Sequence, residues 1–233
     1  MLESAYVGAM HALARPLRAS GLLPRLERAP RASWRFWFAS QFSIYDAARL
    51  AALDVPWWTL AAIERVDRWI ASREGRVRVF EYGSGASTAW LARRCEHVTS
   101  VEHDAAFARY VTPILAFDNV SLRLVEPRRP VSQPVAGSAR RGYEDCDFSA
   151  YVDCIAGDRR YDLIVIDGRA RAACLEHAVR FLAEGGLIVF DNSERKRYQG
   201  ALRLAGLHVE RLRGRTPALP YPSETTLIEL HHG

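Results

Sequence analysis

A glycine-rich loop and a set of acidic residues are the parts of this 233-residue chain that could carry chemistry. The loop spans residues 81–88 and reads EYGSGAST, with two glycines one residue apart followed by small hydroxyl-bearing residues. Loops of this composition usually hold a nucleotide, because glycine lets the backbone approach the ligand closely. Thr88 stands where the dinucleotide-binding pattern G-x-G-x-x-G has its third glycine, so that pattern is incomplete here.

The carboxylates beside the loop indicate which nucleotide it suits. Glu81 precedes the glycines, where its negative charge would repel a pyrophosphate but attract a cationic ligand. Glu102, about twenty residues further along the chain, is placed to accept hydrogen bonds from the diol of a ribose. A ligand with a ribose, a cationic group and no phosphate is S-adenosylmethionine.

The elements that must position these residues follow from the apolar pattern after residue 75. Continuous Val, Ile and Leu runs without polar alternation indicate strands buried on both faces, and therefore a parallel sheet with helices on each side. The pair Gly185 and Gly186 is expected to end the helix before the fifth strand. The expected strands are residues 76–83, 98–104, 120–126, 161–168 and 185–192, with a C-terminal hairpin of residues 207–214 and 225–232 that adds two edge strands.

Every residue with ligand-binding character lies at the carboxyl end of one of these strands. Glu81 is at the end of the first strand, Glu102 of the second and Asp167 of the fourth, and Asp191 and Asn192 are at the end of the fifth. In open parallel sheets the ligand binds outside the carboxyl ends of the strands. We therefore expect one site along this edge of the sheet.

The segments EYGSGAST, VEHD, YDLIVIDG and GGLIVFDN resemble, in this order, the successive motifs of class I S-adenosylmethionine-dependent methyltransferases, from Trp57 to the C-terminus. The resemblance implies an α/β fold. Its core is a doubly wound, Rossmann-like, seven-stranded sheet, mostly parallel with an antiparallel last strand, and a helical N-terminal segment is added to it. Residues 1–74 would be an extension that packs on the core as an acceptor-site cover or a dimer contact. Residues 75–233 would be the S-adenosylmethionine-binding domain.

The resemblance also implies roles for individual residues. Glu81, Gly83 and Gly85 would shape the site of the cofactor's amino-acid end, while Glu102 would bind the ribose and His103 would lie against the adenine. The polar edge of the adenine would meet the segment after the third strand. The expected cofactor-binding residues are Glu81, Gly83, Ser84, Gly85, Ser87, Thr88, Glu102, His103, Asp147, Phe148 and Asp167.

Two hypotheses are open for the residues after the fourth and fifth strands. In one, Asp167, Asp191 and Asn192 hold a divalent cation such as Mg²⁺, as a resemblance to O-methyltransferases of the catechol and caffeoyl-CoA type implies. That subgroup has a lysine where this chain has Ala170. In the other, Asp167 faces the sulfonium or acts as base, Asn192 orients the acceptor, and arginines including Arg171 bind an anionic part of the substrate. A purely structural alternative is that Asp191 and Asn192 cap a following helix, expected over residues 193–205.

An acceptor pocket is predicted from a further resemblance, to bacterial methyltransferases of uncertain substrate with a PWW segment before the first strand. Trp57 and Trp58 would form one wall, and Tyr198 and Glu224 would lie on the far side. The alternative is that both tryptophans pack in the core, at an amphipathic helix with Pro56 in its first turn.

The rest of the chain narrows the choice of partners. The net charge of +5 comes almost entirely from arginines that are scattered rather than gathered in one stripe, so a nucleic acid is not expected. No apolar run is long enough to span a bilayer, and four separate cysteines without metal-ligand spacing fit a cytoplasmic protein.

The segment 34–42, WRFWFASQF, is expected to pack on the main domain or on a second subunit of a homodimer, with a membrane-surface helix as the alternative. The prolines at positions 16, 24 and 30 are expected to divide the first 31 residues into short helices.

These features predict methyl transfer from S-adenosylmethionine to a small or medium-sized acceptor, with oxygen as the favoured atom. One alternative is methylation of RNA or protein, which requires residues 15–31 and 127–142 to form one basic surface. Another is a nucleoside-binding protein without catalysis. A nicotinamide-dependent dehydrogenase is disfavoured by Glu81 and by the missing third glycine.

Overall fold

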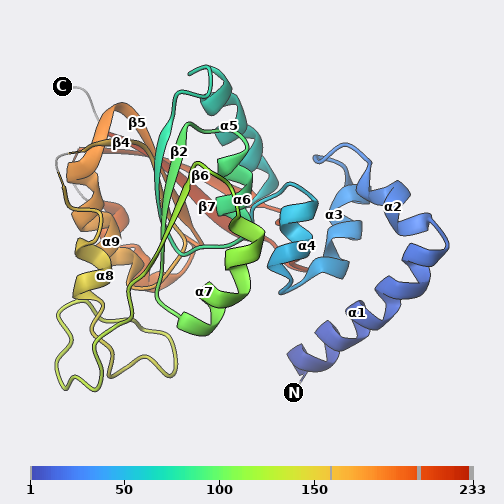
Figure 1. Cartoon of the computed structure of the whole chain (residues 1–233), viewed down its shortest axis with the longest axis horizontal. Coiled ribbons are helices and arrows are strands. Elements are labelled where there is room, and N and C mark those ends of the chain that lie inside the picture. Colours follow the sequence, from blue (N-terminus) through green and yellow to red (C-terminus); the bar gives the residue numbers. More distant parts are fainter. Residues whose placement is uncertain (1, 158, 204–205, 231–233) are drawn as a thin grey trace.

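A seven-stranded sheet organises the chain (Figure 1). The computed structural model describes residues 2–157, 159–203 and 206–230. The strands lie in the order β3-β2-β1-β4-β5-β7-β6. Their bounds are β1 Arg78–Tyr82, β2 His97–Glu102, β3 Val120–Leu124, β4 Tyr161–Ile166, β5 Leu182–Asp191, β6 Leu207–Gly214 and β7 Ser223–Leu230.

The strand directions confirm the predicted doubly wound, Rossmann-like sheet. β1 to β5 are parallel, and β7 runs antiparallel between β5 and β6. The C-terminal hairpin adds two strands beyond β5, at the end of the sheet, as predicted, and one of them forms the outer edge. β7 is buried along most of its length and pairs with β5, so β6, whose residues are only partly buried, is alone on that edge.

Helices cover both faces of the sheet, and a further group of helices lies to one side of it (Figure 1). The α-helices are α1 Leu2–Ala19, α2 Leu22–Glu27, α3 Trp34–Ser40, α4 Ala47–Ala52, α5 Leu60–Ala71, α6 Ala86–Ala92, α7 Ala105–Val111, α8 Ser149–Asp153 and α9 Arg171–Ala178. Short 3₁₀ helices are η1 Gln41–Ser43, η2 Thr112–Leu115, η3 Val179–Phe181, η4 Lys196–Tyr198 and η5 Ala201–Arg203.

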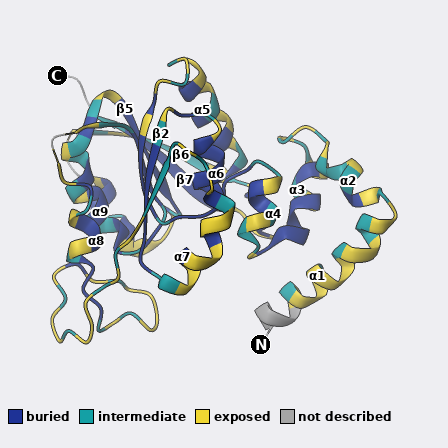
Figure 2. Cartoon of the chain, viewed as in Figure 1, coloured by how far each residue is buried: buried dark blue, intermediate teal, exposed yellow. Residues whose placement is uncertain are grey.

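Two apolar layers form because successive strand residues point to opposite faces of the sheet. Val79 and Val165 belong to the layer that includes α5 and α6. Phe80 and Ile164 belong to the layer that includes α8 and α9. The central strands between these layers are buried (Figure 2).

The aromatic segment around α3 packs on the main domain of its own chain. Nε1 of Trp37 donates a hydrogen bond to the carbonyl oxygen of Leu219 at 3.2 Å, and the N–H of Ala218 donates to Ser40 Oγ at 3.0 Å. Phe36 of the same segment is buried. The division of the chain at residue 74 stays a prediction. α5, from the N-terminal side of that boundary, is part of a layer against the sheet. Within the described ranges, none of the helices combines the length and the hydropathy that a membrane crossing requires.

Gly185 and Gly186 do not end a helix, so that prediction is wrong. α9 ends at Ala178, and both glycines lie inside β5, where its pairing with β4 is irregular. Gly185 has a φ of 64°, and a Cβ on Gly186 would lie 2.8 Å from the carbonyl oxygen of Ala183. The two glycines are therefore required by an irregularity within the strand.

The prolines near the N-terminus also act differently from the prediction. α1 continues through Pro16 to Ala19, so this proline does not end the helix. Pro56 precedes α5 rather than lying in its first turn. The N-cap of α5 is Thr59, whose hydroxyl accepts a hydrogen bond from the N–H of Ala62.

Replacing Trp58 by Ala should lower the free energy of unfolding by about 3–5 kcal/mol, because its ring is fully buried and packs edge to face on Trp90. Urea unfolding followed by circular dichroism measures the loss. Trp57→Ala, at the partly exposed neighbouring ring, is the matched control and should lose distinctly less. Equal losses in the two variants would contradict the placement of Trp58 in the core.

Candidate functional site

The loop after β1 forms the first part of the site. Gly83 has a φ of 96°, and its N–H donates to the carbonyl oxygen of Val101 on β2 at 2.8 Å. A Cβ at Gly83 would lie 2.7 Å from the backbone of Gly168, which follows β4. The chain segments that leave β1 and β4 are therefore in backbone contact, and a larger residue at Gly83 would separate them.

Glu81 supports this loop from within the protein. Its side chain is fully buried, and its carboxylate accepts hydrogen bonds from the hydroxyls of Ser87, Thr88 and Ser100. Burial raises the pKa of Glu81 to about 7, although the three hydroxyl hydrogen bonds act in the opposite direction. Ser87 and Thr88, which follow the glycines, thus donate to Glu81. Direct contact of Glu81, Ser87 and Thr88 with a cofactor stays a prediction.

Glu102 joins the loop after β1 to the loop after β2. Its carboxylate is 3% exposed. It accepts hydrogen bonds from the backbone N–H groups of Ser84, His103 and Asp104 at 3.2, 2.8 and 2.9 Å. The two loops expected to surround one nucleoside are therefore held together at this carboxylate.

His103 lies within a group of aromatic rings. The ring centroids of Tyr143, Phe148 and Tyr151 lie 5.5, 5.8 and 6.1 Å from that of His103. The structure thus brings His103 and Phe148 together, while their contact with an adenine stays a prediction. Nε2 of His103 and the hydroxyl of Tyr151 are buried and have no hydrogen-bond partner among the described residues. Buried polar atoms in this state are rare and indicate a place where a ligand can supply the partner.

The Asp147 carboxylate accepts hydrogen bonds from other residues of the chain. One carboxylate oxygen accepts hydrogen bonds from the Ser149 hydroxyl at 2.7 Å and the Ala136 N–H at 3.1 Å, and the other accepts from Arg128 at 3.1 Å. These partners hold the pKa of Asp147 below its ordinary value, with the Ser149 hydroxyl as the largest cause. Asp147 therefore closes the base of the long loop between β3 and α8, which projects below α8 in Figure 1. Its contact with an adenine stays a prediction.

Arg171, the first residue of α9, lies between the ends of β4 and β5. Its guanidinium donates to the Asp167 carboxylate at 2.7 Å and lies 3.7 Å from the Asp191 carboxylate. The same group donates to the backbone carbonyl oxygens of Asp167, Gly168 and Asp191. The side chain is only 6% exposed. One buried cation thus connects the ends of two neighbouring strands.

Burial dominates the titration of both carboxylates. It raises the pKa of Asp167, and the charges of Arg171, Arg195 and Arg169 act against the rise. Burial also raises the pKa of Asp191 to about 7, with the charge of Asp167 acting in the same direction. The Asp167 side chain is 22% exposed and that of Asp191 is 5% exposed. Asp167 is therefore the member of the pair that a ligand can reach.

These residues do not fit a divalent cation. The position between the Asp167 and Asp191 carboxylates is taken by the guanidinium of Arg171, which already carries a positive charge. The side-chain amide of Asn192 donates to Ser223 Oγ at 3.3 Å. In the part of the chain that the structure describes, no group of three His, Cys, Asp or Glu residues is placed to hold a metal ion.

Asp191 and Asn192 do not cap an α-helix either. Asn192 has a left-handed φ of 51°, and the described residues that follow form only the short turns η4 and η5. The predicted helix over residues 193–205 is therefore wrong for the residues described.

The four predicted acceptor-pocket residues do not belong to one layer of the fold. Trp58 lies in the layer of α5 and α6, and Trp57 packs against the same layer. Tyr198 belongs to the layer on the opposite face of the sheet. Glu224 is largely buried and accepts a hydrogen bond from the Ser193 hydroxyl at 2.8 Å. The two tryptophans and Tyr198 therefore belong to different layers, and an acceptor pocket that they share stays a prediction.

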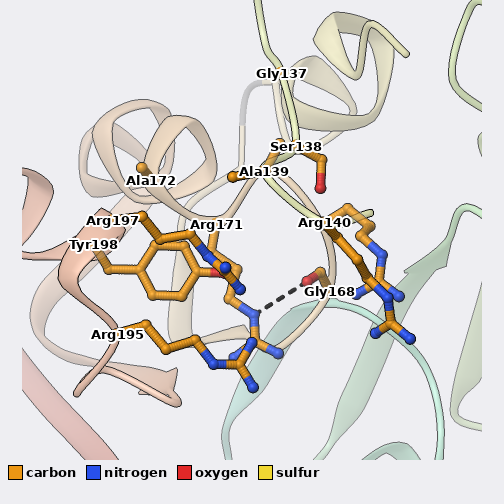
Figure 3. A pocket seen from close by; sticks show the side chains of 12 residues that line it. Gly137, Ser138, Ala139, Arg140, Gly168, Arg171, Ala172, Arg195, Arg197 and Tyr198 are labelled. Atoms are coloured by element: carbon orange, nitrogen blue, oxygen red, sulfur yellow. Dashed lines mark hydrogen bonds between the residues drawn. The ribbon is translucent and has the colours of Figure 1, made fainter. Parts of the chain in front are cut away.

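A cavity of about 150 Å³ lies beside Gly168 (Figure 3). Three segments contribute to it: the loop before α8, the connection from β4 to α9, and the loop after β5. The lining residues are Gly137, Ser138, Ala139, Arg140, Gly168, Arg169, Ala170, Arg171, Ala172, Arg195, Arg197 and Tyr198. Arg140, Arg195 and Arg197 were not among the predicted site residues. The basic run in residues 195–197 is the sequence signal that could have indicated two of them.

Comparison with known families decides the class of this fold. A family described as a methyltransferase domain matches residues 80–193, from β1 to the residues just after β5. Residues 80–193 therefore carry a methyltransferase domain, and the motifs within them are those of the class I S-adenosylmethionine-dependent type. The matched segment of the methyltransferase contains Glu81, Glu102, Asp167 and Asp191, the four acids at the strand ends.

Two solved structures share the fold of this methyltransferase. The O-methyltransferase TomG from Streptomyces achromogenes, involved in tomaymycin synthesis and solved in complex with SAM, aligns with a TM-score of 0.52 and 14% identity over 80% of this chain and 90% of its own. An O-methyltransferase from Bacillus cereus in complex with SAH aligns with a TM-score of 0.54 and 16% identity over 83% of this chain and 91% of its own. At these identities the likeness is one of fold. No curated protein sequence matches the chain.

The buried Glu81 carboxyl should make the stability of the methyltransferase depend on pH. Its folded-state pKa of about 7 lies above the ordinary value of 4.5, so between these values the folded protein retains a proton that the unfolded chain has lost. The free energy of unfolding of the wild type, relative to Glu81→Gln, should therefore fall as the pH rises from about 5 to 8, by up to about 3 kcal/mol.

Urea unfolding of both proteins at several pH values measures this difference. Glu96→Gln, which changes an exposed carboxylate, is the control and should behave as the wild type at every pH. A constant difference between the wild type and Glu81→Gln across the range would contradict a buried, protonatable Glu81.

Proposed function

We propose that this protein transfers a methyl group from S-adenosylmethionine to a hydroxyl of a small or medium-sized acceptor. The observation that carries the proposal is the joining of the Gly83 loop to Glu102 at adjacent strand ends of a methyltransferase domain. The aligned structures are both O-methyltransferases, which supports oxygen as the acceptor atom.

The residues at the ends of β1 and β2 fit a nucleoside. Oε1 of Glu102 accepts from two backbone N–H groups and lies 2.7 Å from His103 Nδ1, whereas Oε2 accepts from the N–H of Ser84. A carboxylate oxygen has about two acceptor positions, so Oε2 keeps capacity for a ribose hydroxyl. The unpartnered atoms of His103 and Tyr151 lie in the aromatic group next to it, where the polar edge of a purine would supply partners. Glu102, His103 and Phe148 would then hold the nucleoside, and the Gly83 loop would hold the amino-acid end.

S-adenosylmethionine, when bound, supplies a methyl group activated by a sulfonium. On the acceptor side, Asp167 would take the proton of the attacking hydroxyl. Its carboxylate is the more open of the buried pair, and burial raises its pKa toward the range in which a general base is effective. Arg171 would position Asp167 through the hydrogen bond of 2.7 Å and the backbone contacts around it. Asn192 would lie beside the acceptor at the end of β5.

Methylation of RNA is the weaker candidate. It requires residues 15–31 and 127–142 to form one basic surface. The first of these segments includes part of α1 and all of α2, which lie at the opposite end of the molecule from the loop below α8 (Figure 1). The two basic segments therefore do not meet in one monomer.

Three further points belong to the proposal. We propose that residues 1–74 cover the acceptor site or form a dimer contact. We also propose that the acceptor is a small molecule and that the protein is cytoplasmic.

Titration calorimetry should detect binding of S-adenosylmethionine and none of NAD, because the loop lacks the third glycine that a dinucleotide requires. Glu102→Gln should weaken S-adenosylmethionine binding by ~10–100-fold, the effect of one hydrogen bond to a charged group. The exposed substitution Glu96→Gln is the matched control and should leave the affinity unchanged. Tight NAD binding would overturn the choice of cofactor. Unchanged affinity in Glu102→Gln would overturn the role of Glu102.

A further inference from the structure

The cavity beside Gly168 carries charge of one sign. It is lined by five arginines and by no acidic residue. Figure 3 shows Arg195 and Arg197 on one side of the cavity and Arg140 on the opposite side. Like charges around one space repel each other, so this arrangement favours an anion among them.

Of the five arginines, Arg171 is the one that the described structure places in ion pairs, with Asp167 and Asp191. The charge of Asp167 also acts on Arg169 and Arg195, at longer range. Within the described ranges no carboxylate forms an ion pair with the other four, which are Arg140, Arg169, Arg195 and Arg197. An exposed arginine without a partner is ordinary. Four of them around one cavity, with no carboxylate in its wall, indicate a binding site.

Arg169 keeps a buried donor without a partner. Its Nε has no hydrogen-bond partner in the described structure, although its side chain also interacts with Tyr143. Its guanidinium carbon lies 5.2 Å from the centroid of the Tyr143 ring. Burial and the charges of Arg140 and Arg171 lower the pKa of Arg169 below its ordinary value. A donor held in this way is satisfied when a ligand oxygen enters the cavity.

We propose that this cavity binds a compact oxyanion, a phosphate group carried by a small-molecule methyl acceptor. The planar fork of a guanidinium matches phosphate oxygens in pairs, and several forks converge on one space here. A phosphate monoester carries a charge of about −1.5 to −2 at neutral pH, which balances the unpaired arginines better than a carboxylate does. That the phosphate belongs to the acceptor rests on the proposed function, whereas the anion site rests on the cavity alone.

The position of the cavity suits the acceptor. Arg171 borders the cavity and also donates to Asp167, so the anion would lie one side chain away from the proposed base. A cavity of about 150 Å³ holds one compact group, since pockets for whole drug-sized molecules measure about 300–1,000 Å³. The remainder of the acceptor would extend from this anchor toward the end of β4.

Inorganic phosphate is the probe, titrated by calorimetry into the whole protein at constant ionic strength. The double variant Arg195→Gln/Arg197→Gln changes two exposed side chains at the cavity and should bind phosphate ~10-fold or more weakly. The matched control Arg68→Gln/Arg109→Gln removes the same charge from exposed positions on α5 and α7 and should bind as the wild type does. Circular dichroism establishes that each variant is folded. If the first double variant does not fold, Arg140→Gln on the opposite wall replaces it.

Equal phosphate affinity in the two double variants, or no phosphate binding by the wild type, would overturn the anion site. Acetate at the same ionic strength should bind more weakly than phosphate, and equal or tighter acetate binding would overturn the choice of phosphate. An RNA oligonucleotide that binds through Arg195 and Arg197 with a steep salt dependence, and more tightly than phosphate, would overturn the small-molecule acceptor. S-adenosylmethionine is titrated separately. Its failure to bind would remove the proposed function and leave the phosphate result to decide the anion site.

Discussion

A buried guanidinium holds the functional edge of this sheet together. Arg171 begins α9, donates to Asp167 after β4 and lies 3.7 Å from Asp191 at the end of β5. Without it, two shielded carboxylates would stand beside each other with like charge. Removing one partner from a buried ion pair costs about 3–5 kcal/mol. The start of a helix, two strand ends and one wall of the arginine-lined cavity therefore depend on a single side chain.

The four acids at the strand ends have different partners, and this difference separates the proposed nucleoside side of the site from the acceptor side. Glu81 is enclosed by three hydroxyls, and Glu102 is held by backbone N–H groups of two loops. Asp191 is shielded by Arg171 and the Thr225 hydroxyl. Asp167 keeps the most exposure among these four acids. The proposed nucleoside side is thus lined by acceptors and aromatic rings, and the proposed acceptor side by guanidinium groups.

The sequence was sufficient for the sheet because strands buried on both faces leave continuous apolar runs. The same runs placed Glu102 and Asp167 correctly at strand ends. The helix–strand boundary near Gly185 could not be predicted in this way. A glycine pair ends a helix or forms a bulge by the same freedom of φ, and only the neighbouring strand decides between them. The burial of Trp58 likewise depends on Trp90, which lies on another helix.

The chemistry of the acceptor side was the least predictable part of the site. From the sequence alone, a basic residue after Asp167 fits a substrate contact or a structural ion pair equally well. The structure distinguishes them, because Arg171 lies in the first turn of α9, between two carboxylates. The arginines of the cavity come from three segments far apart in sequence, so no local pattern unites them. A metal site was a reasonable hypothesis from residue types alone, since nothing in the spacing revealed that a cation of the protein's own lies there.

A Mn²⁺ titration monitored by electron paramagnetic resonance tests most directly whether Arg171 takes the place of a divalent cation, because Mn²⁺ prefers the same oxygen ligands as Mg²⁺. We expect the wild type to show no stoichiometric site that depends on Asp167. One Mn²⁺ bound per chain, lost in Asp167→Asn and retained in the exposed control Asp118→Asn, would contradict this.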